Sequence, residues 1–170
     1  MYKIGRFQIY LILVVALFLQ GSLLSYVKIA GSSPDLLLIC VIFFGLFLGP
    51  GAGLESGIAA GLLKDVFALD FLWINAVILG MTGFIVGTIN PYFFKESKRM
   101  DFIFVFLFTV FSMLLHYCIV SILSNSMALD FSKFFVNSVI PTAIYTALVS
   151  IPIYVSLLDI YNLKEAEDYL

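Results

Sequence analysis

The chain has 170 residues, of which 62% are hydrophobic and 12% are charged, and its net charge is −2. Soluble domains contain about 45–50% apolar and about 25% charged residues, so this composition excludes a soluble globular domain. Because so many residues are apolar, we expect a protein that lies in the lipid bilayer. The small negative net charge leaves no basic surface for binding nucleic acid.

The first apolar run covers residues 7–27 and follows the basic residues Lys3 and Arg6. A helix that spans the membrane needs about 20 mostly apolar residues, so this run is long enough. A basic start before an apolar stretch is also typical of a signal peptide, but this run is too long and lacks a small-residue cleavage site. We therefore predict an uncleaved first membrane span.

Residues 34–69 hold the next two predicted elements. Three features favour a helix start here. A preceding serine can cap the helix, Pro34 fits its first turn, and Asp35 complements the positive end of the helix dipole. The segment Gly49-Pro50-Gly51 breaks the helix, which predicts spans over residues 34–48 and 51–69. A re-entrant hairpin over residues 34–69 remains open, because the first of these runs is short for a span.

Three further spans complete the chain, over residues 72–89, 102–123 and 134–158. The last contains Pro141 and Pro152, each of which removes a backbone hydrogen bond, so we predict a bent helix. The sequence thus predicts an all-α fold, a single transmembrane domain over residues 1–170 that is a bundle of about six helices.

Basic residues predict the orientation, because Lys and Arg favour the cytoplasmic side. With six spans and a cytoplasmic N-terminus, six basic residues fall inside and three fall outside, the inner set being Lys3, Arg6, Lys95, Lys98, Arg99 and Lys164. We therefore expect a multi-pass protein with both termini in the cytoplasm.

Small residues recur at every fourth position through the second and third predicted spans. The series is Gly45, Gly49, Gly53, Gly57 and Gly61, and Asp65 follows at the same interval. Gly83 and Gly87 repeat the spacing in the fourth span. Such faces allow membrane helices to approach closely. They predict either packing among the second, third and fourth helices or docking of another membrane protein.

Ionisable residues within spans are candidates for function because they are costly there. Glu55 and Asp65 lie near the two ends of the third span, and His116 lies within the fifth. The histidine is expected either to bond a neighbouring helix or to relay protons. Asn75 is expected either to cap the fourth helix or to bond a partner. We find no nucleophile–base pair, phosphate-binding loop or metal-ligand cluster, so we expect no enzymatic activity, metal or cofactor.

An ordered set of residues resembles a known family. It runs from Pro34-Asp35-Leu36-Leu37-Leu38 through Gly45-Leu46-Phe47-Leu48-Gly49-Pro50, Gly53 and Gly57 to Gly61-Leu62-Leu63-Lys64-Asp65 and Asn75-Ala76. This set resembles the rod shape-determining protein MreD family over residues 34–90. The tryptophan of Leu72-Trp73-Ile74-Asn75 departs from the pattern, since a glycine-containing turn is expected there.

The resemblance implies a non-enzymatic scaffold in the bacterial cytoplasmic membrane. Its partners would be MreC-like, MreB-like and peptidoglycan synthase proteins, and it would serve cell elongation and shape. An alternative is a vitamin-capturing subunit of an energy-coupling-factor transporter, a class similar in size and helix packing. A cluster of polar side chains at the outer ends of several spans, forming a ligand pocket, would distinguish that alternative.

Overall fold

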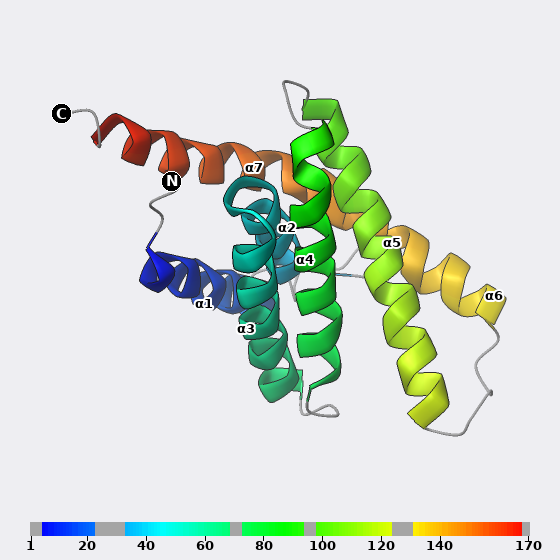
Figure 1. Ribbon diagram of the computed structural model, residues 1–170. Helices are drawn as coiled ribbons and strands as arrows, with labels where there is room; N and C mark the ends of the chain where they lie inside the picture. Colours follow the sequence, from blue (N-terminus) through cyan, green and yellow to red (C-terminus); the bar gives the residue numbers. More distant parts are fainter. Residues whose placement is uncertain (1–4, 23–32, 69–72, 94–97, 124–130, 168–170) are drawn as a thin grey trace.

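A computed structural model describes residues 5–22, 33–68, 73–93, 98–123 and 131–167. These residues are almost entirely helical and contain no strand (Figure 1). The elements are α1 (Arg6–Ser22), α2 (Leu36–Leu48), α3 (Pro50–Ala68), α4 (Ile74–Phe93), α5 (Lys98–Leu123), α6 (Phe131–Phe134), the π-helix η1 (Phe135–Val139) and α7 (Ile140–Glu167). The predicted all-helical fold is confirmed.

The helix boundaries differ in detail from the predicted spans. Residues 23–27 of the first span lie outside the described residues, as does Leu72. The start of α2 differs in its cap: Asp35 is the N-cap and accepts a hydrogen bond from the Leu38 amide at 3.2 Å. Pro34 therefore precedes the helix, and no serine caps it, because the carboxylate of Asp35 already occupies that position.

Helix α2 lies at the centre of the bundle. Every residue from Leu36 to Leu46 is buried, so the helix is apolar on all sides and has no solvent-facing stripe. It packs against α1, α3, α4 and α7, while α3 and α4 lie side by side and share the most extensive contact among the described helices (Figure 1). Helix α5 packs mainly against α7.

The last helical run carries an irregularity next to Pro141. The segment η1 is π-helical, and at its end the Ile140 amide donates to the carbonyl oxygen of Phe135. Proline has no N–H, so the regular ladder is interrupted here, and a π-helical turn is one way to accommodate the gap. Pro152 lies inside α7, which continues to Glu167.

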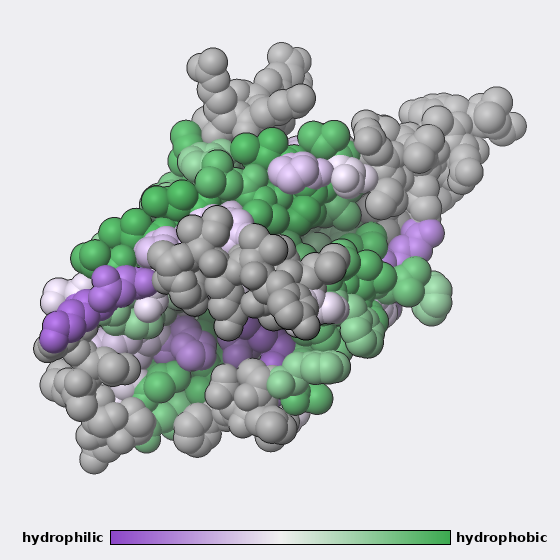
Figure 2. Space-filling model, turned by 180° about the vertical axis from the view of Figure 1, so that it is seen from behind, coloured by the Kyte–Doolittle hydropathy of each residue, from purple (hydrophilic) through white to green (hydrophobic). Residues whose placement is uncertain are grey.

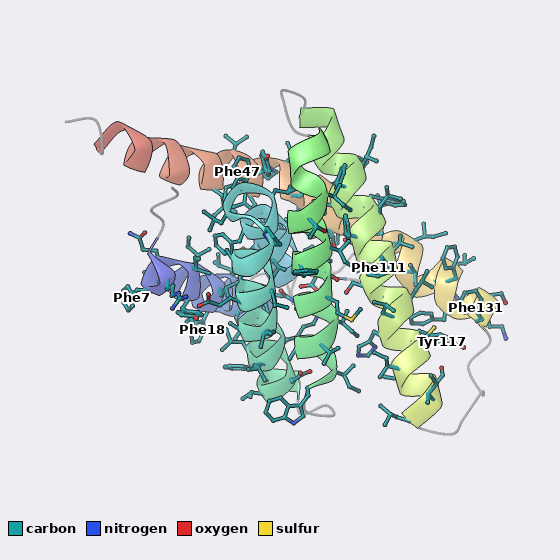
Figure 3. The ribbon with its side chains drawn as sticks, viewed as in Figure 1. Phe7, Phe18, Phe47, Phe111, Tyr117 and Phe131 are labelled. Carbon is teal, nitrogen blue, oxygen red and sulfur yellow. The ribbon has the colours of Figure 1, made fainter. Side chains whose placement is uncertain are left out.

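The outer surface of the described bundle is largely hydrophobic. Residues 102–123 and 131–157 form helices long and apolar enough to cross a membrane, and α1, α2 and α4 contain shorter apolar stretches. Most residues of these two stretches are exposed or half-buried, so most of their apolar side chains face outward. Figure 2 shows the hydrophobic surface from behind, and Figure 3 shows Phe7 and Phe18 projecting from α1. Outward-facing apolar helices are typical of a membrane bundle.

Candidate functional site

Helices α2, α3 and α4 meet along a glycine seam, which we define as Gly53, Gly57 and Gly61 on α3, Gly83 and Gly87 on α4, and Gly45 on α2. A Cβ atom on Gly57 would lie 2.6 Å from the carbonyl carbon of Leu79, and one on Gly53 would lie 2.7 Å from that of Gly83. Both distances are shorter than nonbonded carbon atoms approach, so the two backbones touch directly.

The same contact continues along both helices. A Cβ atom on Gly87 would lie 2.5 Å from the Cα of Pro50, and one on Gly45 would lie 2.8 Å from the carbonyl oxygen of Gly83. At Gly61 it would meet the backbone of Ala76. Helices α2, α3 and α4 therefore occupy the glycine faces within the chain itself.

Gly49 serves the turn rather than the seam. Its φ of +90° lies in the region that favours glycine, and a Cβ atom there would have no neighbour within 4 Å. Its backbone amide donates to the carbonyl oxygen of Gly45 at 3.1 Å, which closes the end of α2. Gly51, in the first turn of α3, also has open space around it.

Asp65 on α3 binds the start of α4. Its carboxylate accepts hydrogen bonds from the backbone amides of Trp73 at 3.0 Å, Asn75 at 3.2 Å and Ala76 at 3.3 Å, and from the Asn75 side-chain amide at 2.6 Å. Asp65 is almost completely buried. A carboxylate at a helix N-terminus satisfies amides that have no partner within the helix and complements its dipole.

Trp73 takes an unusual conformation at this junction. Its φ is +88°, which L-amino acids other than glycine rarely adopt. The tryptophan therefore stands where the family pattern predicts a glycine-containing turn. Its amide is bound by Asp65, while its side chain is exposed.

Asp35 joins α2 to α3 and α7. Its second carboxylate oxygen accepts from the Lys64 ammonium at 2.5 Å, and its backbone amide donates to the Thr146 hydroxyl at 3.2 Å. The Gln20 side-chain oxygen on α1 accepts from the amides of Leu36 and Leu37. Neighbouring helices thus satisfy the first amides of α2, as a membrane interior requires.

Glu55 makes a separate link at the opposite end of α3. Its carboxylate accepts from the Tyr10 hydroxyl at 2.6 Å and lies 3.4 Å from the Arg6 guanidinium. These groups are at least partly exposed, so the ion pair connects α1 and α3 at the edge of the bundle. Exposed pairs of this kind contribute little to stability.

A polar hollow lies beside the start of α2. Its volume is about 430 Å³, and side chains from every described helical run line it. The lining residues are Gln20, Ser33, Asp35, Leu38, Lys64, Asn75, Thr109, Ser112, Met113, His116, Phe134, Ser138 and Thr142. We call this space the polar hollow. It brings together His116, Asp35 and Asn75, which are far apart in sequence, with the Asp35–Lys64 pair on its wall.

The predicted residues fall into three groups. The glycines at positions 45, 53, 57, 61, 83 and 87 meet in the seam, Asp65 and Asn75 join α3 to α4, and Asp35 lines the polar hollow. Pro34 is buried directly before α2. In the part of the chain that the structure describes, no three His, Cys, Asp or Glu side chains are placed to hold a metal ion.

Most of the polar residues that line the polar hollow were not identified in the sequence analysis. Thr109, Ser112 and His116 follow a spacing of three and four residues, which puts them on one face of α5. Ser138, Thr142 and Thr146 recur at intervals of four in the last helical run. Small polar residues at helical spacing within apolar spans are the sequence pattern that would have predicted this part of the lining.

Comparison with known proteins gives one match. The model of the family described as rod shape-determining protein MreD matches residues 1–164, which is nearly the whole chain. No curated protein and no solved structure matches the chain. The matched range includes the glycine seam, the Asp65 junction and every residue that lines the polar hollow.

Proposed function

The chain belongs to the MreD family of rod shape-determining proteins, and from this premise we propose that it is a non-enzymatic membrane scaffold of the bacterial cell-elongation machinery. In this role it helps couple MreC-like and MreB-like proteins to a peptidoglycan synthase. The family match over residues 1–164 is the observation that carries the proposal.

The exposed helix faces support contact with partners inside the membrane. The glycine seam is filled by the chain's own helices, so a partner has no access to it without displacing α4. The surface that remains includes many large apolar side chains, among them Leu107 and Phe111 on α5 and Leu148 on α7. Within lipid, side-chain packing of this kind drives helix association.

We also propose that the protein crosses the cytoplasmic membrane several times and has both ends in the cytoplasm. The start of α1 and the end of α7 lie toward the same side of the bundle in Figure 1. The turn at Gly49, the end of α4 and the start of α5 fall on the cytoplasmic side in this arrangement, which places the Lys98–Arg99 pair inside.

Depletion of the protein in a rod-shaped host tests the scaffold. We expect depleted cells to lose their rod shape, and we expect the wild-type chain to restore it. The polymerising activity of the purified synthase, measured without this chain, should be retained if the role is coupling rather than catalysis. Rods of normal width and length after full depletion would contradict the proposal.

Cysteine labelling tests the orientation. In a chain with Cys40 and Cys118 replaced by alanine, Ser132→Cys should react with a membrane-impermeant maleimide added outside intact spheroplasts. Gly51→Cys should react only after the membrane is opened. Both positions are exposed, so access to the reagent depends on the side of the membrane. The reverse labelling pattern would refute the proposed orientation.

The capture-subunit alternative required polar side chains gathered at the outer ends of several helices. In the proposed orientation, the lining residues of α1 to α4 lie toward the outer helix ends, whereas those of α5 lie in its middle, so the polar hollow meets this requirement in part. A hollow of this size lies within the range of small-molecule sites, about 300–1,000 Å³. Binding a small molecule does not require transport, so the hollow is compatible with a scaffold.

A further inference from the structure

The polar hollow exists because α2 is short. Helix α2 has 13 residues, or about 20 Å at 1.5 Å per residue, whereas α5 has 26 and is about twice as long. The hollow is lined by residues around the start of α2 and by the middle of α5, from Thr109 to His116. Longer helices thus enclose a space beside the end of a shorter one.

The walls of this space are polar although the bundle is apolar. Leu38, Met113 and Phe134 are the apolar residues among those that line it. Polar groups facing a membrane interior cost free energy unless they find partners. If this region served only to pack the helices, apolar side chains would do so at a lower cost in free energy. The polar lining therefore indicates that a polar molecule or group contacts it.

The charged groups of the hollow already have partners. The Lys64 ammonium and the Asp35 carboxylate are 2.5 Å apart and neutralise one another. A ligand with a net charge would need an additional counter-charge from the lining. Apart from His116, the ionisable side chains that line the hollow are Asp35 and Lys64, and these are used by their own ion pair. The electrostatics therefore favour a ligand without net charge.

Three hydroxyl groups in the lining of the hollow can still form hydrogen bonds. The hydroxyls of Ser112, Ser138 and Thr142 line the hollow and make no hydrogen bond to another described residue. Each hydroxyl has one donor hydrogen and two acceptor lone pairs. They lie on α5, η1 and α7, so three helical segments contribute neutral hydroxyls to the lining of the hollow that also holds the Asp35–Lys64 pair.

We propose that the polar hollow binds an uncharged polar organic group rich in hydroxyl, carbonyl or amide functions, held by the hydroxyls of Ser112, Ser138 and Thr142. The group belongs either to a free solute or to the neutral headgroup of a lipid, because both present the same chemistry. This site is independent of the scaffold role and adds a ligand to it.

Native mass spectrometry of the full chain tests the proposal. The protein is purified in mild detergent from its own membranes, and its mass is compared with that of the double variant Ser112→Ala/Thr142→Val. These changes remove two hydroxyls with little change in volume. We expect one uncharged molecule bound per wild-type chain and occupancy reduced roughly tenfold or more in the variant.

Two further variants keep the result interpretable. Ser112→Leu places a larger apolar side chain in the hollow and should reduce binding, whereas Ser132→Ala removes an exposed hydroxyl of α6 and should leave occupancy unchanged. The melting temperature of each variant in detergent shows whether it is folded. If Ser112→Leu fails to fold, the near-isosteric double variant still decides the question.

Extraction into an organic solvent distinguishes the two sources of the ligand. A neutral glycolipid partitions into chloroform–methanol, whereas a free solute stays in the aqueous phase, and either result supports the proposal. An unoccupied wild-type chain, a charged phospholipid in the hollow, or equal occupancy in all variants would overturn it. Cell shape after depletion is scored separately, so failure here leaves the scaffold proposal intact.

Discussion

Helices α2, α3 and α4 pack backbone against backbone, whereas α5 meets the short helix α6 through aromatic side chains. In the first region, glycines bring the α3 and α4 backbones into direct contact, and the residues of α2 from Leu36 to Leu46 are buried. In the second, the Tyr117 ring stacks on Phe134 with centroids 4.8 Å apart, close to Phe131 (Figure 3). Among the described side chains of α5, only Val105 and Thr109 are buried.

The difference shows how a small membrane protein combines rigidity with an available surface. Close backbone contact tolerates no added atom, so the α2–α4 region has a single arrangement. The exposed side chains of α5 and α7, such as Leu107 and Leu148, face lipid or a partner, and each can be exchanged with little effect inside the chain. Substitutions should therefore differ sharply between the two regions.

Gly57→Ala should have the largest effect. The added methyl group would overlap the backbone at Leu79, which cannot move as a flexible side chain can. Overpacking typically costs about 1–3 kcal/mol, and a clash with backbone belongs at or above the upper end of that range. We expect a large fall in the melting temperature in detergent, with Gly57→Leu giving no folded protein.

Gly51→Ala is the matched control, because Gly51 lies on the same helix with open space around it. It should be neutral or slightly stabilising, since alanine favours a helix by roughly 0.5–1 kcal/mol relative to glycine. If both alanine variants melt at the same temperature, backbone contact does not distinguish the two regions.

Asp65→Ala should have the next largest effect. It leaves three backbone amides at the start of α4 without their acceptor, and Asn75 loses the partner of its side-chain amide. We expect a loss of roughly 2–4 kcal/mol, from the lost cap and the buried donors left unpaired. Glu55→Ala on the same helix should cost about 1 kcal/mol or less, because its partners are partly exposed. Equal losses would show that Asp65 has no special role at the junction.

Lys64→Met should have a smaller effect of about 1–2 kcal/mol, since it removes the partner of a carboxylate that is partly shielded from water. Asp35→Ser retains an oxygen that can cap α2 but removes the charge. The effect of Lys64→Met should therefore shrink in the Asp35→Ser background, measured as a double-mutant cycle of melting in detergent. Full additivity would mean that the ion pair contributes nothing.

The sequence predicts the helices well because long apolar runs leave few alternatives. The break at Gly49-Pro50-Gly51 and the interval of four between glycines are visible in the sequence and lie at the turn and in the seam. Which helices the glycines contact is set by tertiary packing. Two features of the α3–α4 junction could not be predicted from periodicity. They are the hydrogen bonds from the start of α4 to Asp65 and the positive φ of Trp73, and both depend on how α3 and α4 are placed relative to each other.

The polar hollow was harder to predict for a different reason. Its lining comes from all the described helical runs, and each run contributes only a few polar residues. Taken singly, Gln20, Ser112 or Thr142 is an ordinary small polar residue in an apolar span. Only the folded structure shows that these residues line the same hollow. The helical spacing of Thr109, Ser112 and His116 does predict that these three share one helix face.

Leu107→Ala on α5 should have the smallest effect on stability. The side chain is 56% exposed, and in a membrane it faces lipid in the folded bundle and in the separated helices alike. Because lipid is as apolar as leucine, removing this side chain changes the free energy by less than about 0.5 kcal/mol. The melting temperature should therefore stay at the wild-type value, in contrast to Gly57→Ala. Cell shape then becomes the informative measurement: loss of rods with unchanged melting would identify this face of α5 as a partner surface, whereas a large fall in melting temperature would mean that α5 is packed as tightly as the seam.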